Sequence, residues 1–168
     1  AGGPWPIYHT TAATVNTSGV VSGLVAGGAN ISYTLSSGCS AGTAIVVNAL
    51  PVLNISPSNS ATVCLGSAAN FTAIAAGSTF TWTGLSGAGG LSCTSCASPP
   101  ITPLATGSNA YSVTATSGAG CITTGGVTVS VNALPSDITG SSSNVCVGTS
   151  TLLTSGSGGI WSASNSNA

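Results

Sequence analysis

The pentapeptide Val-Asn-Ala-Leu-Pro occurs twice in this chain of 168 residues, at 47–51 and 131–135, with an offset of 84 residues. A Gly-Cys pair lies upstream of each copy, and a Val-Cys-x-Gly sequence and then a tryptophan lie downstream. Self-similarity at a fixed spacing indicates repeated structural units. The pattern predicts one whole unit in residues 51–134. It also predicts a split unit, with its back half in residues 1–50 and its front half in residues 135–168.

The two ends of the chain also resemble each other. Gly-Gly-x-Trp ends at Trp5 and again at Trp161, an offset of 156 residues. We therefore expect the chain to be a window on a periodic polymer, overlapping itself by 12 residues. Either the window is one period of a long covalent repeat, or it is a separate subunit whose front half completes the back half of the next subunit by strand donation. Closure of both halves around the whole unit is disfavoured by the short Ala-Leu-Pro linkers.

The local pattern is that of β-strands almost throughout. Apolar residues alternate with small polar residues in four segments, and clusters of Gly, Ser, Asn and Pro separate them. These segments are 69–75, 78–84, 109–117 and 127–135. Many short strands with frequent turns favour a β-sandwich or barrel. Together with the repeat, the expected fold is all-β, with tandem β-sandwiches, one complete and one split between the two chain ends.

Charge is nearly absent, and this excludes several functions. The chain has no Lys or Arg, Asp137 is its only acidic residue and His9 its only histidine. A basic patch for nucleic acid or anionic lipid is therefore impossible, and no apolar run is long enough for a spanning helix. His9, Asp137 and a serine are the residue types of a catalytic triad, but nothing in the sequence places them together. We therefore predict that the chain is not an enzyme. One carboxylate makes a poor calcium site and one imidazole a poor zinc site, so no metal and no cofactor are predicted.

Two stretches resemble known families. Residues 13–35, which run from Ala-Thr-Val through Gly-Val-Val to Ile-Ser-Tyr, resemble the bacterial immunoglobulin-like group 2 domain. Residues 79–121 resemble an immunoglobulin-like repeat of secreted Bacteroidota surface proteins, through Leu-Ser-Cys-x-x-Cys and the later Tyr-x-Val-x-Ala strand. The resemblance implies that the tandem β-sandwiches are immunoglobulin-like, and that the chain is an extracellular stalk, adhesin or filament module. The loss of charge departs from the family pattern, as does Pro-Trp-Pro-Ile-Tyr at residues 4–8.

Six cysteines in a secreted-type chain indicate disulfides. Cys93 and Cys96 lie in a Gly/Ser/Pro-rich loop and are predicted to form a local clip, in preference to a redox or zinc site. The family resemblance implies pairing within each unit, which joins Cys64 to Cys121 and Cys146 to Cys39 of the following copy. These positions could instead fall at opposite ends of a sandwich, and bridges would then join neighbouring domains. Under either pairing Cys146 bonds to the next copy.

Other residues are assigned structural roles. Trp82, Trp161 and Trp5 are predicted core residues, with a sugar-stacking platform as the alternative. Tyr111 resembles the tyrosine that fixes a corner of the sandwich through its hydroxyl. Asn-x-Ser/Thr sequences make four residues candidate glycosylation sites. These are Asn16, Asn30, Asn54 and Asn70.

The predicted function is that of a structural subunit or repeat of an extracellular filament or cell-surface stalk. It would assemble head-to-tail, by completion of the split domain, with disulfide stapling. The partner is another copy or a neighbouring repeat, and glycans are a candidate second partner. The alternative is an adhesin module that binds carbohydrate or a host surface through residues 84–103. A Thr-rich ice-binding face is the third hypothesis, although the Thr spacing is irregular.

Overall fold

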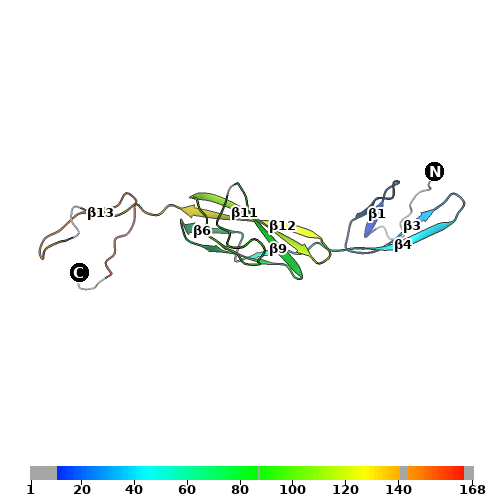
Figure 1. Cartoon of the computed structure of the whole chain (residues 1–168), viewed down its shortest axis with the longest axis horizontal. Helices are drawn as coiled ribbons and strands as arrows, with labels where there is room; N and C mark the ends of the chain where they lie inside the picture. The colour runs from blue at the N-terminus through cyan, green and yellow to red at the C-terminus, as the bar shows by residue number, and fades with distance from the viewer. Residues whose placement is uncertain (1–10, 87, 141–143, 165–168) are drawn as a thin grey trace.

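The computed structural model describes residues 11–86, 88–140 and 144–164, and these residues contain strands and no helix. They form a central unit with a smaller β-structure on either side of it along the chain (Figure 1). The strands β1–β4 lie at one end of the view and β13 at the other, with the central unit between them. Trp5 and His9 fall outside the described residues.

The central unit has a four-stranded main sheet in the order β6-β12-β11-β9. The long strands β11 and β12 form an antiparallel hairpin, β9 pairs antiparallel with β11, and β6 pairs parallel with β12. Their bounds are β6 Ser60–Cys64, β9 Ser78–Gly84, β11 Gly107–Ser117 and β12 Ile122–Asn132. The parallel edge pair is possible because a long connection, rather than a tight turn, joins β6 to β12.

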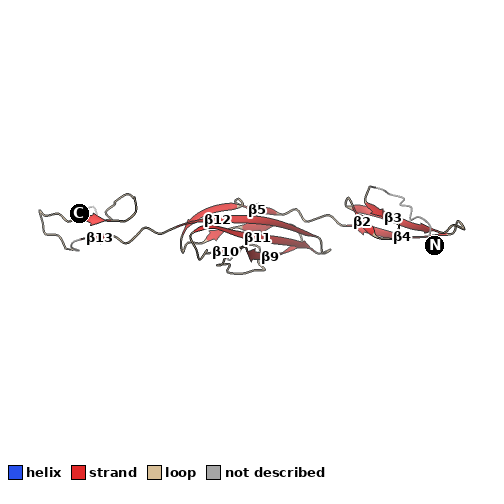
Figure 2. Ribbon diagram, turned by 90° about the horizontal axis from the view of Figure 1, so that it is seen from above, coloured by secondary structure: helices blue, strands red, loops and turns tan. Residues whose placement is uncertain are grey.

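Short strands form a second layer, because their buried residues share one cluster with those of the main sheet. Figure 2 labels two of these strands, β5 and β10. The strand β5 pairs with β8, and β7 pairs with β10, both antiparallel. Their bounds are β5 Asn54–Ser56, β7 Ala69–Asn70, β8 Thr72–Ile74 and β10 Pro100–Ile101. Phe71 separates β7 from β8 and is buried in the core.

Both layers contribute to one hydrophobic core, as the alternating pattern predicts. The inward positions of β11 and β12 are buried while their neighbours are more exposed. The buried cluster contains Ala69, Phe71, Ala73, Trp82, Ile101, Tyr111, Val113, Val127, Val129 and Val131. The unit is therefore a two-layer β-sandwich, and its strands lie within the expected range 51–134.

The N-terminal part consists of two hairpins. The strand β1 (Ala13–Val15) pairs with β2 (Val21–Gly23), and β3 (Gly27–Thr34) pairs with β4 (Ser40–Val47). The buried cluster between them is small and is built from Ala12, Ala13 and Ala29, with Ile45 and Val47 packed against it. This part has a hairpin scaffold but no large buried aromatic side chain among its described residues.

The C-terminal part has one strand pair, between β13 (Thr139–Gly140) and β14 (Leu153–Thr154). The hydroxyls of Thr139 and Thr154 lie 2.9 Å apart across it. This pairing resembles that of β5 and β8, because each joins the segment after Ala-Leu-Pro to the segment after Val-Cys-x-Gly. No side chain described in residues 135–164 is fully buried.

Candidate assembly interface

The front half of the predicted split unit contains a turn of the same geometry as one in the central unit. The amide of Ser67 donates to the carbonyl of Cys64 at 2.9 Å, and that of Thr149 donates to the carbonyl of Cys146 at 3.0 Å. Each turn needs a glycine with positive φ, which is 84° at Gly66 and 82° at Gly148. Since only glycine adopts this conformation readily, the shared Val-Cys-x-Gly sequence dictates the shared turn.

The back half contains a hairpin with the same turn geometry as a hairpin of the central unit. Leu35 N donates to Cys39 O at 2.8 Å, as Ser117 N donates to Cys121 O at 2.9 Å. A second bond, from Gly38 N to Leu35 O, matches the bond from Gly120 N to Ser117 O, and both are 2.9 Å. The β3–β4 hairpin is thus the counterpart of the β11–β12 hairpin, and Ile31 is the counterpart of the buried Val113.

The two hairpins differ in their neighbours. In the central unit the β11–β12 hairpin lies between β9 and β6, which pair with its two edges. Among the described strands, β3 and β4 pair only with each other. The counterpart of β6 is the segment that ends at Cys146, and the counterpart of β9 is the segment that contains Trp161. Both segments belong to the front half. Residues 144–146 and 157–163 form no strand in this chain.

The front half exposes apolar side chains that the central unit covers. Trp82 is 1% exposed, whereas its counterpart Trp161 is 57% exposed. Val147, the counterpart of the half-buried Leu65, is fully exposed. Ile160 beside Trp161 is also fully exposed, and its counterpart Thr81 beside Trp82 is exposed as well. The other large apolar side chains exposed here are Ile138, Val145, Leu152 and Leu153. The core role predicted for Trp161 is therefore not fulfilled by the described residues of this chain, since more than half of its surface is exposed.

Four of these side chains line a hollow of about 470 Å³, whose other lining residues are Pro, Ser, Thr and Gly. Ile138 and Leu153 line it from β13, β14 and their flanks, and Ile160 and Trp161 line it from the C-terminal segment. In the central unit the inward residues of β11 and β12 share one buried cluster with Trp82. The hollow thus brings large apolar side chains of both segments of the front half together.

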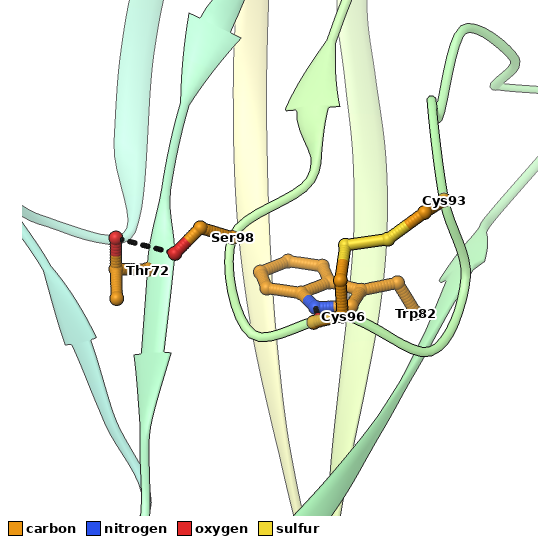
Figure 3. The surroundings of a disulfide bond; sticks show 5 residues. All are labelled: Thr72, Trp82, Cys93, Cys96 and Ser98. Atoms are coloured by element: carbon orange, nitrogen blue, oxygen red, sulfur yellow. Dashed lines mark hydrogen bonds between the residues drawn. A yellow bond between two sulfur atoms is a disulfide. The ribbon is translucent and has the colours of Figure 1, made fainter.

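The loop that joins β9 to β10 makes structural contacts within the central unit. Cys93 and Cys96 form a disulfide, and the loop around them covers the indole of Trp82 (Figure 3). Trp82 donates from its backbone N to Thr94 O at 2.7 Å and from Nε1 to Cys96 O at 2.9 Å. The hydroxyl of Ser98 bonds that of Thr72 at 2.9 Å. The loop thus satisfies polar groups at the edge of β9 and closes the sandwich there.

The other four cysteines form no disulfide within the chain. The within-unit bridge between Cys64 and Cys121 does not fit this fold. Cys64 is the ladder partner of Asn132 at the end of β12, and Cys121 directly precedes the start of β12. That strand of 11 residues separates the two by roughly 35 Å, whereas disulfide Cα atoms lie within about 7 Å. Cys121 instead approaches the neighbouring segment, with Sγ at 3.8 Å from Asn48 O.

Tyr111 is fully buried, and its hydroxyl donates to Gly89 O at 2.7 Å. Burial raises the pKa of its phenol above the ordinary value of 10.0. The bond fixes the β9–β10 loop, which differs from the corner role predicted for this tyrosine. Asn109 holds the corner before β11 instead, because its Nδ2 donates to Ala105 O at 3.0 Å and Gly107 O at 3.3 Å.

The candidate glycosylation residues are all exposed. The Oδ1 atom of Asn16 accepts bonds from the amides of Ser18 and Val20, so this side chain shapes the β1–β2 turn. A second, shallow hollow of about 410 Å³ lies beside β5 and has no aromatic lining residue. The described residues contain no cluster of three or more potential metal ligands and no helix long and apolar enough to cross a membrane.

Comparison with known proteins finds similarity only at the level of distant structures. Neither a protein-family model nor a curated protein matches the sequence. A crystal structure of the S-layer protein SbsC is 16% identical with a TM-score of 0.38, over 81% of this chain and 21% of that chain. The N-terminal four Ig domains of Dscam1 are 16% identical with a TM-score of 0.40, over 70% of this chain and 32% of theirs.

Fibronectin(III)-like modules of CbhA from Clostridium thermocellum are 17% identical with a TM-score of 0.36. That match covers 66% of this chain and 65% of theirs. The chain thus spans about a fifth of the S-layer structure and about a third of the Dscam1 structure that it matches.

Proposed function

We propose that this chain is a structural subunit or repeat of an extracellular filament or cell-surface stalk. The front half of one copy, residues 135–168, and the back half of the next copy, residues 1–50, would together form one β-sandwich. Whether successive copies are separate subunits or parts of one longer chain, the same two halves meet. The β3–β4 hairpin would enter the hollow beside Trp161, between the counterparts of β6 and β9.

One observation carries the proposal: Trp161 is exposed where its counterpart Trp82 is buried, and the hairpin that buries Trp82 has its counterpart at the far end of the same chain. Burial of a large apolar side chain stabilises a contact by about 1.5–3 kcal/mol. Several such side chains are exposed together in the front half. A head-to-tail contact of this kind does not close on itself unless its rotation forms a ring, so it propagates as a filament.

An extracellular or cell-surface location fits the same proposal. The Cys93–Cys96 disulfide requires an oxidising environment to form and persist. The chain has no Lys or Arg, so it offers no site for trypsin-like proteases. Both properties suit a durable fibre outside the cell.

Charge introduced into the interface tests the proposal. An aspartate at Trp161 would be buried without a partner on completion, since its counterpart Trp82 is buried, and this costs several kcal/mol. One at Val147 would be half-buried, like its counterpart Leu65. We expect Trp161→Asp and Val147→Asp to remain monomeric in light scattering and to form no filaments in electron micrographs. Leu104→Asp is the matched control, because Leu104 is 76% exposed on the central unit, outside the interface. Filaments from all three variants would rule out completion through this face.

A further inference from the structure

We infer that the four cysteines outside the Cys93–Cys96 clip join consecutive β-units, as Cys121 to Cys146 of the preceding copy and Cys64 to Cys39 of the following copy. The inference rests on the proposed completion of the split unit, and it adds the covalent connectivity. It assigns two bridges to each contact between copies.

The first step concerns Cys121. Its Sγ lies 3.8 Å from the carbonyl oxygen of Asn48, so the hairpin end of the central unit touches the end of β4 in the preceding unit. Thr123 Oγ1 also donates to Pro51 O at 2.8 Å and ties the start of β12 to the same linker. Cys121 therefore lies at the junction with the preceding unit, not inside its own unit.

The second step places Cys146 at this junction. In the central unit Cys64 is the ladder partner of Asn132, and Leu65 N donates to Asn132 O at 2.9 Å. Cys146 and Asn48 are the counterparts of Cys64 and Asn132. In the completed unit Cys146 of the preceding copy therefore lies beside Asn48, at the spacing of neighbouring strands, about 5 Å. Cys121 and Cys146 then flank the same residue, within the range in which a disulfide forms.

The third step applies the same relation to the other junction. Cys64 lies beside Asn132, the residue that leads into the linker 133–135. Cys39 lies in the turn of the β3–β4 hairpin, the counterpart of the turn that ends at Cys121. In the completed unit that turn faces the linker, so Cys39 of the following copy meets Cys64. Both residues are exposed in the isolated chain.

The chemistry of each bridge is an ordinary thiol–disulfide exchange. Two cysteine thiols lose two protons and two electrons, and an S–S bond forms between them. A disulfide such as oxidised glutathione accepts these protons and electrons and is reduced to two thiols.

Peptide mapping tests the connectivity directly. Equal amounts of ¹⁵N-labelled and unlabelled chain are assembled with reduced and oxidised glutathione, free thiols are alkylated, and unreduced material is digested with elastase. We expect linked peptides that contain Cys64 with Cys39 and Cys121 with Cys146, many of them with one labelled and one unlabelled partner. Peptides that join Cys64 to Cys121 or Cys39 to Cys146 would overturn the inference, as would four free thiols.

Two double variants give a matched second test on non-reducing denaturing gels. Cys64→Ser with Cys39→Ser removes one of the two bridges, so the ladder of covalent oligomers persists. Cys64→Ser with Cys121→Ser removes one partner from each bridge, so the ladder is lost. Pairing within units predicts the reverse for both variants. If filaments appear in electron micrographs but the ladders are reversed, only this connectivity fails. If the reduced and oxidised chains both stay monomeric, the proposed completion fails with it.

Discussion

At the scale of single residues, Trp82 and Trp161 occupy corresponding positions in the sequence repeat but lie in different environments. Trp82 is enclosed by the core and donates its indole proton to the disulfide loop. We expect Trp82→Ala to lower the free energy of unfolding of the central unit by about 3–5 kcal/mol, because it leaves a large cavity. Trp161→Ala is the matched control and should change the stability of the monomer by less than about 0.5 kcal/mol. Urea unfolding of both variants measures this, and an unchanged midpoint for Trp82→Ala would contradict the assignment.

The burial of Tyr111 allows us to predict how the free energy of unfolding depends on pH. Burial raises its pKa above 10 in the folded chain, so the folded state holds this proton more tightly than the unfolded state. The resulting stability is fully present below about pH 10, the pKa of an unfolded tyrosine, and is lost as the pH rises through the folded pKa. Tyr111→Phe should lose about 0.5–1.5 kcal/mol at neutral pH, with the hydrogen bond to Gly89.

The difference in thermal stability between wild type and Tyr111→Phe, measured from pH 8 to pH 11.5, isolates this group from the other tyrosines and the thiols. The difference should shrink above pH 10. A gap that stays constant up to pH 11.5 would show that Tyr111 does not titrate in this range in either state.

At the scale of elements, the β9–β10 loop depends on one glycine. Gly90 has φ of 86°, and a Cβ there would overlap the carbonyl of Thr102. We expect Gly90→Ala to cost at least about 1–3 kcal/mol from backbone strain alone. Gly118→Ala is the matched control, because a Cβ at Gly118 meets no atom within 4 Å. Equal melting temperatures for the two variants would contradict the geometry of the loop.

Much of this level could be predicted from the sequence, since alternation and turn residues are local signals. The segments 78–84 and 109–117 closely match β9 and β11, whereas 127–135 overlaps only the second half of β12. The partner of Tyr111 could not be predicted, because Gly89 is 22 residues away and a loop brings it close. The positions of Cys64 and Cys121 depend on the parallel pairing of β6 with β12, which no local pattern reveals.

At the scale of the whole molecule, the described residues contain one two-layer sandwich and a smaller β-structure on either side of it along the chain. The repeat in the sequence indicates which parts correspond, because matching turns need matching glycines. The exposure of the front half adds what the sequence could not show: among the described residues, its large apolar side chains are exposed to solvent. The near absence of charge removes the repulsion that usually protects exposed edges from association.

A density map of the assembled chain at side-chain resolution is the most direct measurement of trans-completion. The account predicts alternating sandwiches along the fibre, one within a single copy and one composed of two copies. In the composite sandwich the β3–β4 hairpin of one copy lies against Trp161 of its neighbour. A map in which residues 135–168 contact residues 1–50 of their own copy, or in which Trp161 stays exposed to solvent, would contradict the account.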